Sequence, residues 1–228
     1  MYQPPTDLQP ERTRDGSLTL RSATLNAQYH SRHGAVQEST HVFIKAGLEA
    51  IGKDTVDVLE VGLGTGLNLL LTWIRCLEGK LNVNYTALEP YPLTHEQLEV
   101  LRHCEDLAWP GLHEPFLERM QDGSGAWHAG MGGLTFRQLG TAVEEFDETN
   151  AYDVIYFDAF EPVVQPDMWT EEVFQRMHAA LRPGGILVTY CAKGDVRRAM
   201  KAVGFKLDRL DGPPGKREMV RAKRIQNS

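Results

Sequence analysis

The stretch Val58-Leu59-Glu60-Val61-Gly62-Leu63-Gly64-Thr65-Gly66-Leu67-Asn68 decides the fold of this chain. A short apolar run leads into three glycines at alternate positions, and an apolar segment with helical spacing follows them. This order predicts a strand, a tight loop and a helix. Because glycine has no Cβ and accepts positive φ, such a loop can bring its backbone against a ligand at the helix N-terminus. The sequence therefore predicts a small-molecule site here.

The spacing of the glycines separates two kinds of ligand. A dinucleotide fingerprint needs G-x-G-x-x-G after the strand. Gly62 and Gly64 fit it, but Leu67 takes the place of the third glycine and Gly66 arrives one residue early. The order E-x-G-x-G-x-G resembles instead the first motif of S-adenosylmethionine-dependent methyltransferases. The next predicted strand ends in Glu89, where an acid can bind both hydroxyls of a ribose.

The rest of the chain from Thr55 alternates apolar strands with helices, which predicts a doubly wound, mostly parallel, Rossmann-like α/β sheet. Further strands are expected at 83–88, 134–139, 152–157 and 186–190, and helices at 67–77, from Thr94 and at 170–181. Residues 104–133 are rich in glycine, proline and polar residues and predict a long connection or insertion. Ligands bind at the carboxyl ends of such strands. Four residues of interest fall there: Gly62, Glu89, Gly140 and Asp158.

Residues 1–54 precede the first core strand and predict an N-terminal appendage that covers the site. Asp15-Gly16 separates two alternating segments, which favours a hairpin, and apolar residues from Val36 to Ile51 favour a helix. Residues 55–228 form the expected Rossmann-like domain. It ends in a hairpin of strands 205–210 and 219–224, joined by a turn with two prolines between glycines.

The bulk composition indicates one ordinary globular core with this appendage: 228 residues, 42% hydrophobic and 24% charged. No apolar run approaches the roughly 20 residues of a membrane helix, and Met1–Pro5 does not begin a signal peptide, so we expect a cytoplasmic protein without membrane contact. The scattered cysteines and histidines match no metal-binding motif, and we expect no metal.

The charge is unevenly distributed along the chain. From Lys193 to Ser228 there are eleven Lys and Arg and four Asp and Glu, a net +7, whereas residues 1–192 carry a net −14. A basic C-terminal face can bind phosphates, although a solvated helix face is the plainer alternative. The cations that we expect to contact nucleic acid are Lys193, Arg197, Lys216 and Arg217.

The segment Asp158-Ala159-Phe160-Glu161-Pro162 follows the strand that faces the transferred group in this architecture. Methyl transfer needs a nucleophile with a lone pair held in line with the breaking bond. If that nucleophile is an amine, Asp158 can accept its N–H groups, and Phe160 can stack on a planar base. A cap on the next loop is the structural alternative for Asp158. Enzymes that methylate the exocyclic amine of adenine carry a different motif here, so a more basic side-arm amine fits better.

Six segments of this chain resemble the family formed by MnmD and the methyltransferase half of the bifunctional MnmC proteins: 29–35, 38–44, 60–68, 158–162, 189–194 and 212–219. The resemblance covers about Asp15 to Lys223, and Gly-Pro-Pro-Gly-Lys-Arg-Glu-Met at 212–219 is its most specific part. It implies transfer of a methyl group from S-adenosyl-L-methionine to the primary amine of 5-aminomethyluridine, or its 2-thio form, at the wobble position of tRNA. It also implies no FAD, because no second glycine-rich loop follows, and upstream tRNA-modifying enzymes that supply the aminomethyl group.

The same resemblance implies roles for individual residues. Asp158, Phe160 and Tyr29 are expected to meet the aminomethyl uracil. Thr141 stands where the family usually has an acid, and its hydroxyl is a weaker partner for the adenine amino group. The residues expected to bind the methyl donor are Glu60, Gly62, Gly64, Gly66, Asn68, Glu89, Gly140 and Thr141.

Two other functions stay open at this stage. Polyamine aminopropyltransferases, such as spermidine synthase, share the sheet, the ribose acid and an aspartate-led segment, and they also use a primary amine. They usually carry a further acidic pair for a polyamine, which is not clear here, and a basic tail repels a polycation. A non-catalytic Rossmann-like binding module is the third possibility, against which the intact glycine loop with Glu89 and Asp158 argues.

Overall fold

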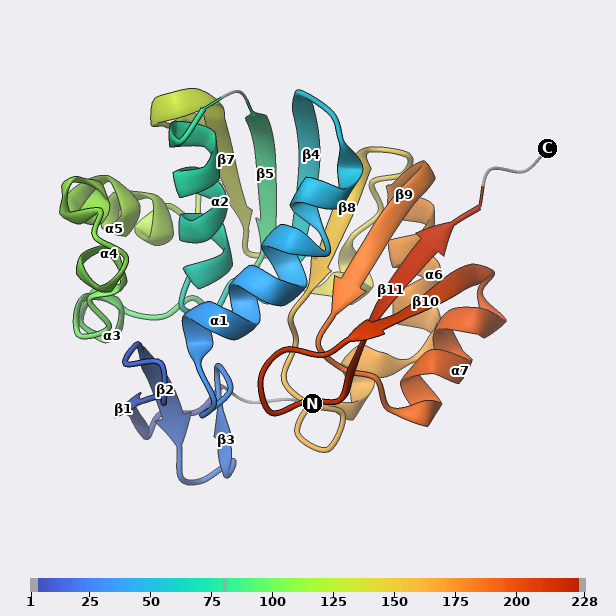
Figure 1. Cartoon of the computed structure of the whole chain (residues 1–228), viewed down its shortest axis with the longest axis horizontal. Coiled ribbons are helices and arrows are strands. Elements are labelled where there is room, and N and C mark those ends of the chain that lie inside the picture. Colours follow the sequence, from blue (N-terminus) through green and yellow to red (C-terminus); the bar gives the residue numbers. More distant parts are fainter. Residues whose placement is uncertain (1–3, 80, 226–228) are drawn as a thin grey trace.

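A computed structural model describes residues 4–79 and 81–225 of the chain. Residues Met1–Gln3, on which the expectation about a signal peptide partly rests, lie outside that part. The central sheet is built from β4 (Thr55–Val61), β5 (Asn82–Leu88), β6 (His128–Ala129), β7 (Leu134–Leu139), β8 (Tyr152–Phe157), β9 (Leu181–Thr189), β10 (Phe205–Asp211) and β11 (Glu218–Arg224). Their order across the sheet is β10-β11-β9-β8-β4-β5-β7-β6 (Figure 1).

The middle of this sheet is parallel, and its strands are apolar because both faces are covered. β4 pairs in parallel with β5 and β8, while β11 joins β9 in antiparallel register. Along β4, Val56 and Val58 pack into one hydrophobic cluster and Leu59 and Val61 into the other. Alternate side chains of one strand thus serve two cores, as the period of a strand requires. The predicted doubly wound, mostly parallel sheet is confirmed.

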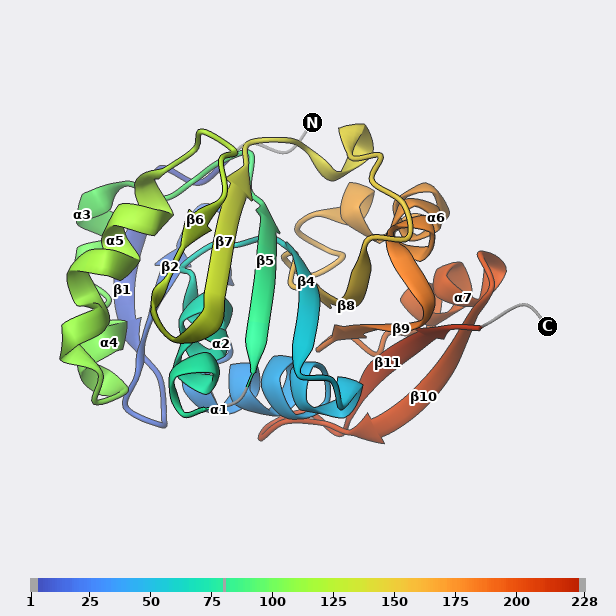
Figure 2. The ribbon, with the colours of Figure 1, turned by 90° about the horizontal axis from the view of Figure 1, so that it is seen from above.

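Helices cover the two faces separately (Figure 2). One face carries α2 (Leu67–Leu77) and the helical segment α1 (Ala35–Ser39), η1 (Thr40–Lys45, a π-helix) and η2 (Leu48–Ile51). The other face carries α6 (Glu171–Ala180) and α7 (Gly194–Ala202). The helix expected from Val36 to Ile51 is therefore present in three pieces, and it ends at Gly52, whose φ of 65° is left-handed. The bounds of α7 were not predicted from the sequence.

The predicted connection at 104–133 contains more structure than expected. After α3 (His95–Glu99), which begins with the capping box of Thr94 and Gln97, come α4 (His103–Asp106), η3 (Pro110–Leu112), α5 (His113–Gln121) and η4 (Met131–Gly133). α5 forms because Phe116, Leu117 and Met120 share one helix face and are buried in the core. The remaining short helices are η5 (Val143–Glu145) and η6 (Pro166–Trp169).

The N-terminal part forms a separate antiparallel sheet of β1 (Leu8–Arg12), β2 (Leu18–Ser22) and β3 (Ala27–Gln28). The predicted hairpin around Asp15-Gly16 is confirmed, and so is the C-terminal hairpin of β10 and β11. None of the helices within the described residues has both the length and the apolar character needed to span a bilayer.

The loop of the C-terminal hairpin packs against the N-terminal part of the chain. His41 Nε2 lies 2.8 Å from the carbonyl oxygen of Asp211. A Cβ at Gly215 would overlap the ring of His33, at 2.2 Å from the ring atom Cδ2. Segments about 170 residues apart in sequence therefore meet beside the carboxyl ends of the parallel strands.

Candidate active site

The glycine loop between β4 and α2 takes a conformation that favours glycine. Gly62, Gly64 and Gly66 have φ values of 87°, 50° and 72°. A Cβ at Gly62 would lie 2.8 Å from the carbonyl oxygen of Asp158, and one at Gly64 would lie 2.9 Å from the Tyr29 ring. The missing side chains therefore allow Asp158, after β8, and Tyr29, from the N-terminal part, to pack directly against the loop.

A buried chain of hydrogen bonds links Glu60, on the side where the methyl donor is expected, to Asp158, on the side where the amine is expected. The Asn68 amide donates from Nδ2 to Glu60 Oε1 and to Asp158 Oδ2, each at 2.8 Å. The Tyr85 hydroxyl donates to the other oxygen of Glu60 at 2.8 Å. Glu60 is fully buried, at 0% exposed. One amide group thus holds two carboxyl groups that come from different strands.

Burial changes the proton affinity of both carboxyl groups. Burial raises the pKa of Asp158 to about 7; the Asn68 hydrogen bond and the Lys216 charge lower it, and the Glu38 charge raises it. Burial also raises the pKa of Glu60 well above its usual range, against the hydrogen bond from Asn68. Asp158 therefore changes charge near neutral pH, as groups at functional sites often do.

Glu89 lies at the end of β5, next to the glycine loop. Its Oε2 accepts the N–H of Gly64 and its Oε1 accepts that of Tyr91, both at 3.0 Å. Burial raises the pKa of Glu89. The Glu89 N–H donates to the Leu139 carbonyl at 3.0 Å, which places Gly140 and Thr141 directly after the neighbouring strand end.

The aromatic residues predicted to cover the acceptor also lie together. The rings of Tyr29 and Phe160 are 4.9 Å apart, edge to face, with an angle of 69° between their planes. The backbone of Phe160 is fixed on both sides: its N–H donates to Gln165 Oε1 at 3.0 Å, and its carbonyl accepts from Trp169 Nε1 at 2.8 Å. The N-terminal part and the loop after β8 thus meet over the glycine loop.

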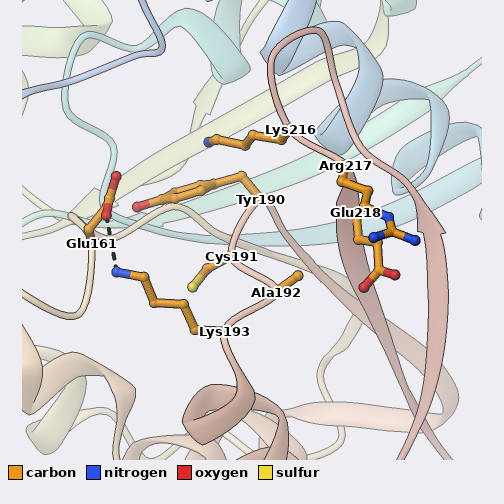
Figure 3. A pocket seen from close by; sticks show the side chains of 8 residues that line it. All are labelled: Glu161, Tyr190, Cys191, Ala192, Lys193, Lys216, Arg217 and Glu218. Atoms are coloured by element: carbon orange, nitrogen blue, oxygen red, sulfur yellow. Dashed lines mark hydrogen bonds and ion pairs between the residues drawn. The ribbon is translucent and has the colours of Figure 1, made fainter.

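A pocket of about 430 Å³ opens beside this site. Figure 3 shows its lining residues: Glu161, Tyr190, Cys191, Ala192, Lys193, Lys216, Arg217 and Glu218. Tyr190 is anchored because its hydroxyl donates to the Ala159 carbonyl, next to Asp158, at 2.8 Å. Lys193 Nζ lies 3.1 Å from Glu161 Oε2. The volume lies within the usual range of small-molecule binding sites.

Lys216 turns into the site from the C-terminal hairpin loop. Its Nζ lies 2.7 Å from Glu38 Oε2 and 3.9 Å from the centre of the Tyr190 ring, over its face. The Glu38 side chain is only 9% exposed. The sequence led us to expect a phosphate contact at Lys216, and this inward position was not foreseen. Glu38 and Tyr190 are not among the predicted site residues. Glu38 lies far from Lys216 in the sequence, and only the folded chain brings the two together.

The other predicted cations divide between two places. Lys193 and Arg217 line the pocket with Lys216, whereas Arg197 lines a separate groove on α7. Among the described residues, no three His, Cys, Asp or Glu side chains gather as metal ligands.

The residues at the donor side fit S-adenosyl-L-methionine. The Oδ1 atom of Asn68 is buried and accepts no hydrogen bond from the described residues, so it can receive an N–H from a ligand. The glycine loop presents backbone without side chains, and Glu89 provides the acid for a ribose. Glu60, the loop and Asn68 would hold the methionine part, and Glu89 the ribose.

Three comparisons place the chain among known proteins. Residues 133–225 match the family model described as S-adenosyl-L-methionine-dependent methyltransferase. The chain is 31% identical over 230 residues to the tRNA 5-methylaminomethyl-2-thiouridine biosynthesis bifunctional protein MnmC of Aromatoleum aromaticum, covering 92% of this chain and 34% of that protein. It spans about a third of the length of the curated relatives that it matches.

Two solved structures are also similar. The crystal structure of MnmC2 from Aquifex aeolicus matches with a TM-score of 0.79 at 26% identity, covering 96% of this chain and 71% of that one. Spermidine synthase from Thermotoga maritima matches with a TM-score of 0.58 at 14% identity, covering 100% and 73%, which shows a shared fold alone. The chain is therefore an S-adenosyl-L-methionine-dependent methyltransferase of the MnmC family.

Proposed function

We propose that this protein transfers a methyl group from S-adenosyl-L-methionine to the primary amine of 5-aminomethyluridine, or its 2-thio form, at the wobble position of tRNA. The observation that carries the proposal is the Asp158 carboxyl group, held by Asn68 against Glu60 beside a cation-lined pocket. The MnmC relatives are named for the biosynthesis of 5-methylaminomethyl-2-thiouridine in tRNA, which supports the same substrate.

Asp158 is the residue that orients the amine. Asn68 occupies its Oδ2, and no hydrogen bond from the described residues reaches its Oδ1, which can therefore accept an N–H of the substrate. An amine held by this bond keeps its lone pair directed away from the carboxylate, toward the donor side. The donor supplies a methyl group on a positively charged sulfur.

The proton balance follows from the pKa of Asp158. The amine attacks as the neutral form; the new N–C bond forms as the C–S bond breaks, and the nitrogen becomes a secondary ammonium. Since burial raises the pKa of Asp158 to about 7, its carboxylate can stabilise that positive charge and accept or relay the proton. Phe160 and Tyr29 cover the reacting atoms and limit the access of water.

The pocket favours a nucleotide over a polyamine. Its lining carries three cations, Lys193, Lys216 and Arg217, and two carboxylates, Glu161 and Glu218, which leaves an excess of positive charge. Such a wall attracts the phosphates of RNA and repels a polycation, which argues against an aminopropyltransferase. We also propose that residues 1–54 act as a cover for the site, since Tyr29 and Glu38 both belong to that part.

The test is methyl transfer itself. The purified protein is incubated with labelled S-adenosyl-L-methionine and tRNA from cells that lack this methylation, and the nucleosides are analysed by mass spectrometry. We expect 5-methylaminomethyluridine with wild-type protein and at least a hundredfold lower rate with Asp158→Asn. Absence of this product, together with aminopropylation of putrescine when decarboxylated donor is supplied, would overturn the proposal.

A further inference from the structure

A second groove lies on the face opposite η1, between α7 and β10. It has a volume of about 270 Å³ and is lined by Gly194, Arg197, Arg198, Lys201, Leu207 and Arg209. We call it the α7–β10 groove. Four of these residues are cations, in a protein whose net charge is −7. None of them takes part in the chemistry described above.

The positive charge of the groove is weakly neutralised. Arg197 and Lys201 form no ion pair with any side chain in the described part of the chain. Arg198 pairs with Asp195 across an exposed helix surface. Arg209 lies 3.7 Å from Glu218 and is 58% exposed. Exposed pairs of this kind contribute little free energy, so these arginines can exchange their carboxylate for a phosphate.

The groove adjoins the active-site pocket at the start of α7. Lys193 lines the pocket and is the N-cap residue of α7, and Gly194, the first residue of that helix, lines the groove. At 1.5 Å per residue, the nine residues of α7 extend about 13 Å away from the pocket. That length is enough for several consecutive phosphates of one RNA strand.

Basic residues are concentrated in the last part of the sequence, to which the groove belongs. Residues 1–192 carry a net charge of −14 and residues 193–228 carry +7. A polyanion is therefore attracted to α7 and β10.

We propose that the α7–β10 groove binds the sugar–phosphate backbone of the substrate RNA next to the nucleotide in the pocket. This inference rests on the proposed function. The contacts are to phosphates alone, so they hold the RNA without reading its sequence. Arg197 and Lys201 carry most of the binding, because they have no carboxylate to release.

The first experiment measures RNA binding without catalysis. The affinity of a fluorescent RNA hairpin without the aminomethyl group is measured by anisotropy at several salt concentrations, for wild type, Arg197→Gln/Lys201→Gln, Lys201→Gln and Lys45→Gln. Lys45 is a matched control because it is exposed and lies on η1, on the other face of the sheet. We expect the double variant to bind about tenfold more weakly. The slope of its log binding constant against log salt concentration should become shallower by about 0.7–0.9 for each cation removed.

The control readouts separate this inference from the proposed function. Calorimetry should give the same affinity for S-adenosyl-L-methionine in all variants, which also shows that they are folded. Equal RNA affinity and equal salt dependence in wild type and the double variant would overturn the proposed RNA binding by the α7–β10 groove. The proposed methyl transfer would not be affected by that result. Groove-dependent RNA binding by a wild-type protein that methylates no tRNA would overturn the proposed function alone.

Discussion

Asp158 combines two features that a catalytic carboxylate needs: a fixed position and a proton affinity near the working pH. Its position comes from the Asn68 amide at 2.8 Å, and its raised pKa comes first from burial. Ionised carboxylates are costly to bury, so Asp158 must balance that cost with its hydrogen bond and with the nearby Lys216 charge.

The pH dependence of methyl transfer should report this balance. If the carboxylate is the active form, as proposed, kcat/KM should fall as pH decreases through the pKa of Asp158, which is about 7 without donor and lower when the sulfonium is bound. Asn68→Ala removes a hydrogen bond that stabilises the charged form, so the acid limb of its profile should move to higher pH. The measurement is kcat/KM against pH at saturating donor.

The substrate amine titrates at the same pH with wild type and with Asn68→Ala, so it does not contribute to the difference between their pH profiles. An acid limb at the same pH in wild type and Asn68→Ala would show that Asp158 does not control it. Calorimetry of donor binding completes the control, since Asn68 also contacts Glu60.

The glycine loop between β4 and α2 packs directly against the backbone of Asp158. Gly62 and Gly52 both have left-handed φ values, 87° and 65°, but their surroundings differ. A Cβ at Gly62 would meet the backbone of Asp158, which cannot move aside, whereas one at Gly52 would meet nothing within 4 Å.

This difference gives a matched pair of variants. Gly52→Ala should cost only the backbone strain of a left-handed alanine, about 1 kcal/mol in the free energy of unfolding, and should keep full activity. Gly62→Ala should lose more stability and at least tenfold in donor affinity, because it separates the loop from β8. Urea unfolding and calorimetry measure the two effects. Equal losses in both variants would mean that close approach to β8 is unimportant.

The elements that the sequence predicted are those whose signal is local. Most strands from β4 to β9 are apolar runs, and their alternation with helices predicts Glu89 and Asp158 at one edge of the sheet. The sequence suggests a helix face in this basic region but does not bound α7, because its buried side chains, Val196 and Met200, are few among the cations. The inward position of Lys216 depends on a contact with Glu38, which no local pattern contains.

At the scale of the whole molecule, the N-terminal part packs against the loop of the C-terminal hairpin. Lys216 joins Glu38, His41 joins the Asp211 carbonyl, and Gly215 packs on His33. A half-buried ammonium facing a buried carboxylate depends on its partner, since either group alone would be left without compensation.

A double-mutant cycle should measure this junction. Glu38→Gln and Lys216→Met should each lower the free energy of unfolding by about 1–3 kcal/mol, and the double variant should lose less than their sum. Both single variants should also raise KM for tRNA, because Lys216 lies over the Tyr190 ring in the pocket. Urea unfolding and steady-state kinetics provide the data. Strictly additive losses would show that the two side chains act independently.

The amide bridge of Asn68 has a consequence for the order of events. Because one NH₂ group donates to both Glu60 and Asp158, the two carboxyl groups are held close to each other and to the expected donor site. A sulfonium arriving on one side adds a positive charge, which lowers the pKa of a nearby carboxyl group. Without donor, a carboxyl group with a pKa of about 7 is partly protonated at neutral pH. Donor binding should therefore shift Asp158 toward its ionised form, so the methyl donor would prepare the carboxylate before the amine arrives.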